Sequence, residues 1–242
     1  MPQWLHRSFS PHSDGAFPVR VGRFVEGHGY CDERKLISLS FQARIVCKAC
    51  NGGWMADLET EVLPVLGPLI QKEQPDGLRA DLKSLRQHGP LLALWLAKTA
   101  LTTSYALPGR LRLPDWFAGD ISQKRIPPGL WVDVATSQSA DVGTALSKGF
   151  PTFNGDTFAG FTMHTSGRCF QFCIQAGHLL LRIGMADAAL VGYVAPNGLA
   201  PWRLFPDMEA ELPVCGHYPD LKSFFQLIVL RTWAGCAGEV PA

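Results

Sequence analysis

The sequence predicts an α+β protein with a metal-binding ββα unit at the N-terminal end, a helical middle and an antiparallel β-rich C-terminal part. Residues 37–45 alternate between apolar and polar side chains, which is the period of a strand. From Trp54 to Ile70 an apolar residue recurs at every fourth position, which is helical. Three strand-like runs follow one another between residues 160 and 183. We therefore expect three parts, spanning residues 1–75, 76–109 and 110–242.

The first half divides into elements at its glycine and proline residues. We expect a short helix over residues 2–9, and hairpin strands over 18–26 and 36–46 that are joined by a loop beginning at Gly27. Residues 51–72 have helical periodicity, but Pro64 and Pro68 should break or kink this helix. Further helices are expected over residues 79–87 and 90–106, the second of them buried.

The second half is predicted to be richer in strands. Residues 131–134 are typical of a strand, and three runs should form an antiparallel meander: 160–164, 169–175 and 179–183. The apolar residues 220–234 are expected to form a closing helix.

Composition and charge are those of an ordinary soluble protein. The 242 residues are 47% apolar and carry a formal net charge of +1, enough for one large or two small domains. A dedicated nucleic-acid binder is usually more basic, although six cations lie in the hairpin region and could contact phosphates or simply face solvent: Arg20, Arg23, Arg34, Lys35, Arg44 and Lys48. No signal peptide is evident, and the longest apolar run, Leu91–Ala97, is far shorter than the ~20 residues of a membrane span. We expect a cytoplasmic protein without membrane contact.

A C-x-x-C motif at Cys47 and Cys50 is the strongest chemical indication in the chain. Two thiolates at this spacing can bind one zinc ion, and cysteine in a reducing compartment is more often a ligand than half of a disulfide. A structural zinc ion is usually four-coordinate, so two more ligands are needed. Cys31 and His28 in the hairpin loop are candidates. The alternatives are a two-ligand half-site and a pair of core thiols.

The residues after the motif have two interpretations each. Asn51 could cap the following helix through its side-chain oxygen, or could take part in a metal or catalytic site. Trp54 and Met55 are expected to anchor the helix in the core rather than to contact a ligand. Glu59 could support a ligand from behind, and a surface position is the simpler expectation.

The run C-x-x-C-N-G-G-W-M-A-D-L-E at residues 47–59 resembles a family of bacterial and phage HNH-endonuclease-like proteins. Residues 2–5 (P-Q-W-L) resemble the end of an upstream E-H-x-x-P-Q-W-L motif of that family, and residues 94–100 resemble its W-x-x-K-T-A helix. The resemblance implies an HNH-type ββα unit, in which a histidine activates water and a carboxylate holds a divalent ion such as Mg²⁺. The Glu-His pair would lie just before Met1, so we expect either an upstream start or a member without the nuclease centre. His6 and His12 are the nearest replacement bases, and the shift along the chain argues against both.

Two main functions follow from these observations. The first is an HNH-type nuclease-family protein that acts on DNA phosphodiesters, truncated or inactive as written. The second is a non-catalytic zinc-knuckle module that binds nucleic acid or a protein partner. A redox C-x-x-C protein is a weaker third interpretation, because the Trp-Cys-x-x-Cys context of a thioredoxin-like site is absent.

Overall fold

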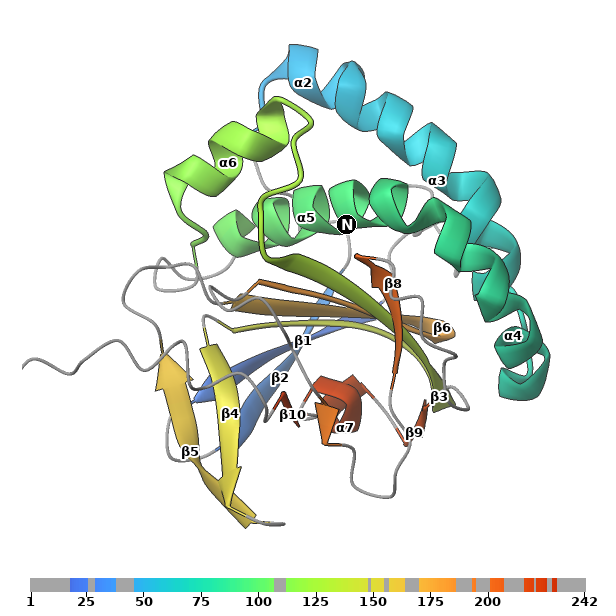
Figure 1. Ribbon diagram of the computed structural model, residues 1–242, viewed down its shortest axis with the longest axis vertical. Coiled ribbons are helices and arrows are strands. Elements are labelled where there is room, and N and C mark those ends of the chain that lie inside the picture. Colours follow the sequence, from blue (N-terminus) through green and yellow to red (C-terminus); the bar gives the residue numbers. More distant parts are fainter. Residues whose placement is uncertain are drawn as a thin grey trace, which may run out of the picture.

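The predicted α+β class is confirmed by the computed structural model, in which a mixed sheet is covered by helices. The structure describes residues 18–25, 29–37, 46–106, 112–147, 149–154, 157–163, 170–185, 193–194, 201–206, 216–219, 221–225 and 228–229. The helices α3, α4, α5 and α6 arch over one side of the sheet, while α7 lies on the other side (Figure 1). Among the described residues, no helix has the length and apolar character needed to cross a membrane.

The helical layer follows the sequence pattern in part, since the helix expected over residues 79–87 is divided between an α-helix and a 3-10 helix. Its elements are α2 (Lys48–Gly52), α3 (Trp54–Ile70), α4 (Pro75–Asp81), the 3-10 helix η2 (Leu82–His88), α5 (Gly89–Ala106) and α6 (Asp115–Ser122). The buried helix expected over residues 90–106 is confirmed as α5. The helix expected over residues 51–72 is divided at Gly53 into α2 and α3.

Pro64 and Pro68, which were expected to break or kink the helix, do not break it, because α3 runs through both residues without interruption. Proline removes the backbone bond to the carbonyl four residues earlier, which for Pro64 is the carbonyl of Thr60. Thr60, Pro64 and Pro68 are all exposed. Water can therefore bond the released carbonyl groups, and the helix continues on its buried face.

The sheet is built around two long strands, β3 (Leu130–Ser147) and β6 (Phe170–Met185), which pair antiparallel. The other edge of β3 pairs in turn with β8 (Trp202–Phe205), β9 (His217–Tyr218) and β1 (Pro18–Val25). β2 (Gly29–Ile37) pairs with β1, and the short helix α7 (Leu221–Phe225) packs against β3 and β6. Two small ribbons complete the fold: β4 (Gly149–Asn154) with β5 (Thr157–Met163), and β7 (Tyr193–Val194) with β10 (Ile228–Val229).

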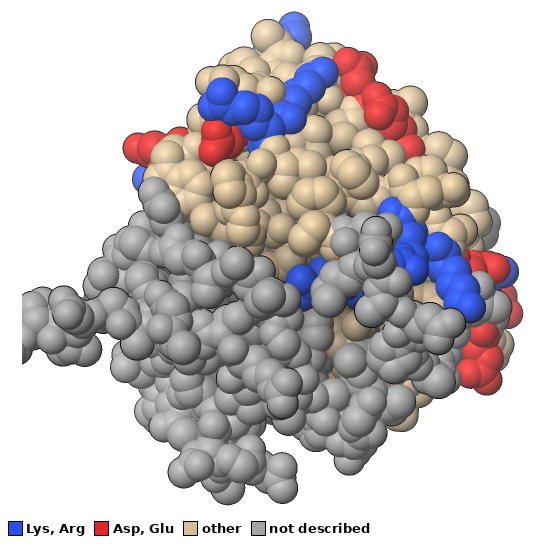
Figure 2. Space-filling view, in the orientation of Figure 1, with Lys and Arg blue, Asp and Glu red and all other residues tan. Residues whose placement is uncertain are grey.

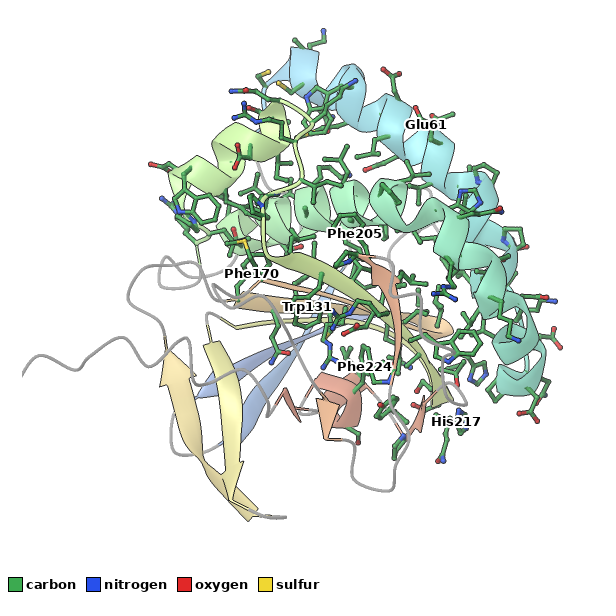
Figure 3. The ribbon with its side chains drawn as sticks, in the orientation of Figure 1. Glu61, Trp131, Phe170, Phe205, His217 and Phe224 are labelled. Atoms are coloured by element: carbon green, nitrogen blue, oxygen red, sulfur yellow. The ribbon has the colours of Figure 1, made fainter. Side chains whose placement is uncertain are left out.

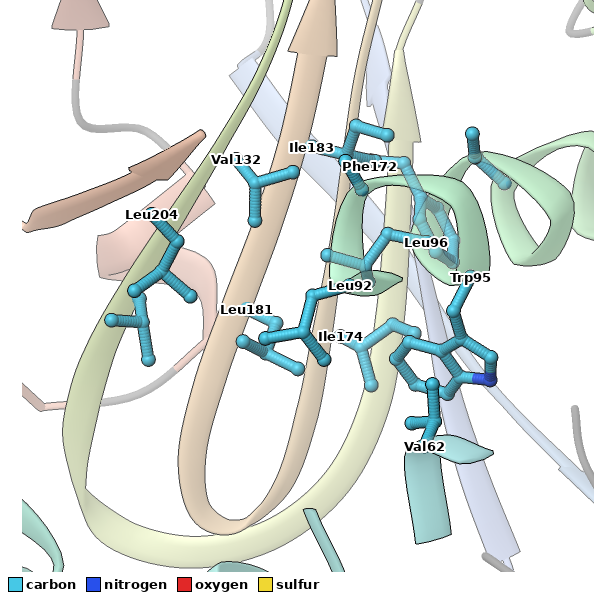
Figure 4. Close-up of a cluster of buried hydrophobic side chains, with 14 of the residues drawn as sticks. Val62, Leu92, Trp95, Leu96, Val132, Phe172, Ile174, Leu181, Ile183 and Leu204 are labelled. Atoms are coloured by element: carbon cyan, nitrogen blue, oxygen red, sulfur yellow. The ribbon is translucent and has the colours of Figure 1, made fainter. Parts of the chain in front are cut away.

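The predicted meander is wrong, because residues 170–175 and 179–183, which were expected to form two strands, fall on the single strand β6. Gly177, which lies between them, has a φ of 62° within an irregularity of the ribbon. The register of β3 against β6 shifts between Thr136 and Asp141, opposite this glycine. The ribbon bends back on itself there instead of ending (Figure 4). The run at 160–164 lies largely on β5, which pairs with β4.

Two other elements differ from the prediction. The closing helix expected over residues 220–234 ends as α7 at Phe225, and Ile228–Val229 form β10. A short apolar run has no period that separates helix from strand, and these residues pair with β7. The second hairpin strand begins at Gly29, not at residue 36. The charged residues 32–35 lack the apolar alternation that predicts a strand, although an edge strand such as β2 tolerates charge well. Residues 38–45 lie outside the described residues, so the complete ββα unit stays a prediction.

One hydrophobic cluster joins the helices to the sheet. It draws on α3, α5, α6, β3, β6 and β8. Leu92, Trp95 and Leu96 of α5 lie between the sheet residues and Val62 of α3 (Figure 4). Residues from all three predicted parts thus share a core, and the boundaries at 75 and 109 remain a prediction.

Candidate functional site

The two cysteines of the C-x-x-C motif form one tight turn at the start of α2. Cys47 is the N-cap of this helix, with extended backbone angles. The Cys50 backbone N–H donates to Cys47 Sγ at 3.2 Å, and the Asn51 N–H donates to the Cys47 carbonyl oxygen at 2.9 Å. The sequence thus folds both thiols onto the same turn, at the outer end of the helical arch (Figure 1).

Both thiols are accessible, and their pKa values are shifted in opposite directions. Cys47 is exposed and Cys50 is half-buried, and neither forms a disulfide. The pKa of Cys47 is lowered, chiefly by the Cys50 side chain and then by the Cys50 backbone N–H, which both donate to its sulfur. The pKa of Cys50 is raised by its hydrogen bond to Cys47, by desolvation and by the neighbouring charge. One thiol of the pair is therefore prepared to be a thiolate, the form that binds metals.

Asn51 does not cap a helix, so that expectation is wrong. It lies inside α2 and is exposed, while Cys47 caps α2 and Gly53 stands at the start of α3. The helical turn begins earlier than predicted because the Cys47 sulfur already accepts the first N–H group. A metal-binding or catalytic role of Asn51 stays a prediction.

The residues after the turn attach it to the core, as predicted. Met55 is 9% exposed and Leu58 is 6% exposed, and Trp54 packs partly buried against the same cluster. The Trp54 side chain also lowers the pKa of the Cys50 thiol, against the larger effects that raise it. Trp54 therefore links the thiol turn directly to α3.

Glu59 is not the simple surface residue that was expected. Its carboxylate forms an ion pair with Lys98 of α5, a residue that is 5% exposed. Burial lowers the pKa of Lys98, and the charge and hydrogen bond of Glu59 oppose that effect. The sequence analysis placed Lys98 at the end of an apolar run and in the segment that resembles the W-x-x-K-T-A helix, but assigned it no partner. A lysine on the apolar face of a buried helix could have indicated a buried partner, because lysine is almost never fully buried unpaired.

Of the two other predicted zinc ligands, the structure describes the backbone of Cys31 only. Cys31 lies in β2 opposite Arg23 of β1, not in a loop, because β2 begins at Gly29. His6, His12 and His28 lie outside the described residues. Within the described ranges, no three histidine, cysteine, aspartate or glutamate residues gather as a metal-binding group.

A second polar cluster, formed by Asp133, Arg182 and Arg203, lies inside the sheet. Asp133 Oδ2 accepts bonds from Arg182 Nε at 3.1 Å and Nη2 at 2.9 Å, and Oδ1 accepts from Arg203 Nε at 2.7 Å. The Asp133 and Arg182 side chains are fully buried. Both guanidinium groups lie over the Trp131 ring, at 5.2 and 5.1 Å, and Arg182 also lies over Phe224 at 4.8 Å. Figure 3 labels these two aromatic residues, Trp131 on β3 and Phe224 on α7. Such a buried, mutually satisfied cluster is structural.

A hydroxyl–imidazole contact near the bend is also structural. Thr136 Oγ1 lies 2.9 Å from His217 Nδ1 and 3.4 Å from the Gly216 carbonyl oxygen. Thr136 is fully buried, so a substrate cannot reach its hydroxyl group. Gln175 secures the same bend by donating to the Ser139 carbonyl at 2.6 Å and accepting from the Leu221 N–H at 3.1 Å.

Charge on the visible face is mixed. Small groups of basic and acidic side chains lie near one another over the outer helices, with a broad uncharged area between them (Figure 2). No protein-family model, no curated protein and no solved structure matches the chain. Function must therefore be inferred from the residues and their geometry.

Proposed function

We propose that this chain is an HNH-endonuclease-like protein in which Cys47 and Cys50 hold a structural zinc ion. The observation that carries the proposal is the bond from the Cys50 N–H to Cys47 Sγ at the start of α2. A backbone donor aimed at sulfur stabilises the thiolate, which is both the metal-binding and the more strongly hydrogen-bonded form. The turn is accessible and opens directly into an anchored helix, as a zinc knuckle requires.

The remaining ligands are proposed from the sequence. Zinc bound by cysteine and histidine is usually tetrahedral, so two further ligands complete the shell. Cys31 and His28 are the candidates from this chain. Their nitrogen and sulfur donors suit zinc better than Mg²⁺ or Ca²⁺, which prefer oxygen.

Action on DNA is supported by the meeting of two segments that resemble the HNH-like family. Residues 47–59 contain Glu59 and residues 94–100 contain Lys98, and these two side chains form the ion pair between α3 and α5. Two segments that are far apart in the sequence therefore form one structural unit. In this interpretation the substrate is a DNA phosphodiester, and a second divalent ion such as Mg²⁺ serves the chemistry where the Glu-His half of the motif is present.

A non-catalytic zinc module that binds nucleic acid or a protein is the second candidate. The observation that favours it is the exposure of the turn, since α2 has no buried residue. A metal ion held there would stiffen an accessible surface, whether or not a catalytic base is nearby.

The zinc content of the purified protein tests the proposal. We expect close to one zinc per chain in the wild type and in Cys173→Ala, a matched control whose thiol is buried away from the turn. Cys47→Ser should lose the metal and also melt at a lower temperature, because structural zinc contributes to folding. Metal-free wild-type protein that melts like Cys47→Ser would contradict the proposal.

A plasmid-cleavage assay with Mg²⁺ or Mn²⁺ separates the two candidates. No adjacent Glu-His pair occurs among the 242 residues, and loss of a general base alone typically costs ~10²–10⁴-fold in rate. We expect DNA binding without measurable cleavage if the HNH-like interpretation holds for this form. Binding to a protein but not to DNA would favour the second candidate. Robust cleavage that is lost in His6→Ala would instead assign a base to the N-terminal segment.

A further inference from the structure

The ion pair between Glu59 and Lys98 lies where the thiol turn is attached to the rest of the molecule. Glu59 is on the second turn of α3, and Lys98 is in the middle of α5. The Lys98 side chain is 6% exposed and the Glu59 side chain is 24% exposed. A buried ammonium group requires a partner, so this contact fixes which part of α3 faces α5.

The thiol turn and the start of α3 form one unit. The N–H groups of Ala56 and Asp57 donate to the Gly53 carbonyl oxygen at 2.8 and 3.1 Å. The helices α2 and α3 also contact each other directly, and the Ala49 carbonyl oxygen of α2 lies against Gly53 at the start of α3. A rotation of α3 about its axis would therefore turn the thiols with it.

Apolar packing alone restrains this rotation weakly. Met55, Leu58 and Val62 bury one side of α3, but hydrophobic contacts are not directional and tolerate small rotations. A charge-assisted hydrogen bond is directional and is stronger than a neutral one. In some proteins a buried ion pair fixes the structural register while it adds little to stability.

We propose that Lys98 is a positioning residue for the metal site: through Glu59, it fixes the rotation of α3 and thereby the direction in which the Cys47 and Cys50 thiols face. The inference rests on the proposed zinc site. It assigns a role in metal binding to a residue that contacts neither the metal nor its ligands.

The double variant Glu59→Leu with Lys98→Met separates positioning from stability. Replacing a buried ion pair by apolar residues of similar volume is often neutral or stabilising. We therefore expect a melting temperature, measured without metal, equal to or above that of the wild type. Zinc affinity, measured by competition with a chelator, should fall about 10-fold, the lower end of the loss seen when groups supporting metal ligands are removed. The absorption spectrum of the Co²⁺-loaded variant should also differ from that of the wild type.

Two controls make the outcome decisive. Lys72→Met with Asp81→Leu removes an exposed ion pair of 3.0 Å that lies outside both α3 and α5, and should leave zinc affinity unchanged. Phe224→Leu weakens packing at α7 and reports what general destabilisation does to metal binding.

If the wild type binds zinc and the Glu59–Lys98 double variant binds it equally well, the positioning role is overturned while the zinc site stands. An equal loss of affinity in Phe224→Leu would also overturn it, and a wild type without zinc would overturn both proposals.

Discussion

The thiol turn at Cys47 and the charge cluster at Asp133 differ in the solvent exposure of their polar groups and in how those groups are bonded. In the sheet, Asp133 accepts bonds from two arginines, and all three side chains are nearly or completely shielded from water. At the turn, the Cys47 sulfur accepts a backbone bond at 3.2 Å but remains exposed. The Asp133 cluster uses its hydrogen-bonding groups within the protein, whereas the thiol turn leaves its sulfur atoms accessible to a ligand.

This contrast separates a structural polar cluster from a functional one. A buried ion cluster is costly to disrupt, because removal of one partner leaves an uncompensated charge. An exposed thiol pair can be altered with little effect on the metal-free fold. The two regions should therefore respond oppositely to mutation, with stability lost at the sheet and metal binding lost at the turn.

Removing the carboxylate of the buried cluster should have the largest effect. Asp133→Ala leaves Arg182 and Arg203 buried without their shared acceptor, and breaking a buried pair typically costs about 3–5 kcal/mol. Urea denaturation should show this loss in the free energy of unfolding. The control is Asp120→Asn, which breaks the pair between Arg125 and Asp120 at the surface and should cost less than about 1 kcal/mol. Similar losses in the two variants would remove the contrast between buried and exposed polar groups.

Overpacking beside the same cluster should have an intermediate effect. A Cβ atom on Gly184 would lie 2.1 Å from the Trp131 ring, the ring that both arginines cover. Gly184→Ala should therefore destabilise the protein by about 1–3 kcal/mol. Gly119→Ala in α6 is the matched control, because nothing lies within 4 Å of its Cβ position. That variant should be neutral or up to about 1 kcal/mol more stable, since alanine favours helix. A neutral Gly184→Ala would show that Trp131 is free to move.

Lys98, between the turn and the core, should give the smallest effect, seen as a pH dependence. Burial lowers its pKa from the ordinary 10.5. Between the folded and unfolded pKa values the unfolded chain binds more protons, so the Lys98 contribution to the free energy of unfolding rises with pH. Urea titrations at a series of pH values should show the wild type gaining stability relative to Lys98→Met as the pH approaches the pKa of free lysine, 10.5. A difference that is constant or falls with pH would contradict the burial of the ammonium group.

The periodicity of the sequence predicted the helices because their apolar faces are continuous. The helix at 90–106 and the anchoring roles of Trp54 and Met55 followed directly from side-chain spacing. The path of the strands did not, because the bend of β3 and β6 depends on a register shift that no local pattern records. A glycine such as Gly177 is compatible with both a turn and a bent strand, so the sequence does not distinguish the two.

The candidate site was predicted in the same uneven way. Cys47 and Cys50 are three positions apart in the sequence, so their shared turn was evident. The cap at Cys47 in place of Asn51 depends on where the turn begins. Lys98 and Glu59 are 39 residues apart, and their contact depends on helix packing. Arg182 and Arg203 meet Asp133 from other strands, and single-strand periodicity cannot assign such partners.

X-ray absorption at the zinc edge of the zinc-loaded protein tests the central claim most directly. If Cys47 and Cys50 are ligands, the first shell should contain at least two sulfur neighbours at about 2.3 Å. Cys50→Ser should lose one of them, and Cys173→Ala should lose none. A first shell without sulfur, or the same number of sulfur neighbours in Cys50→Ser as in the wild type, would contradict the assignment of this turn as a metal site.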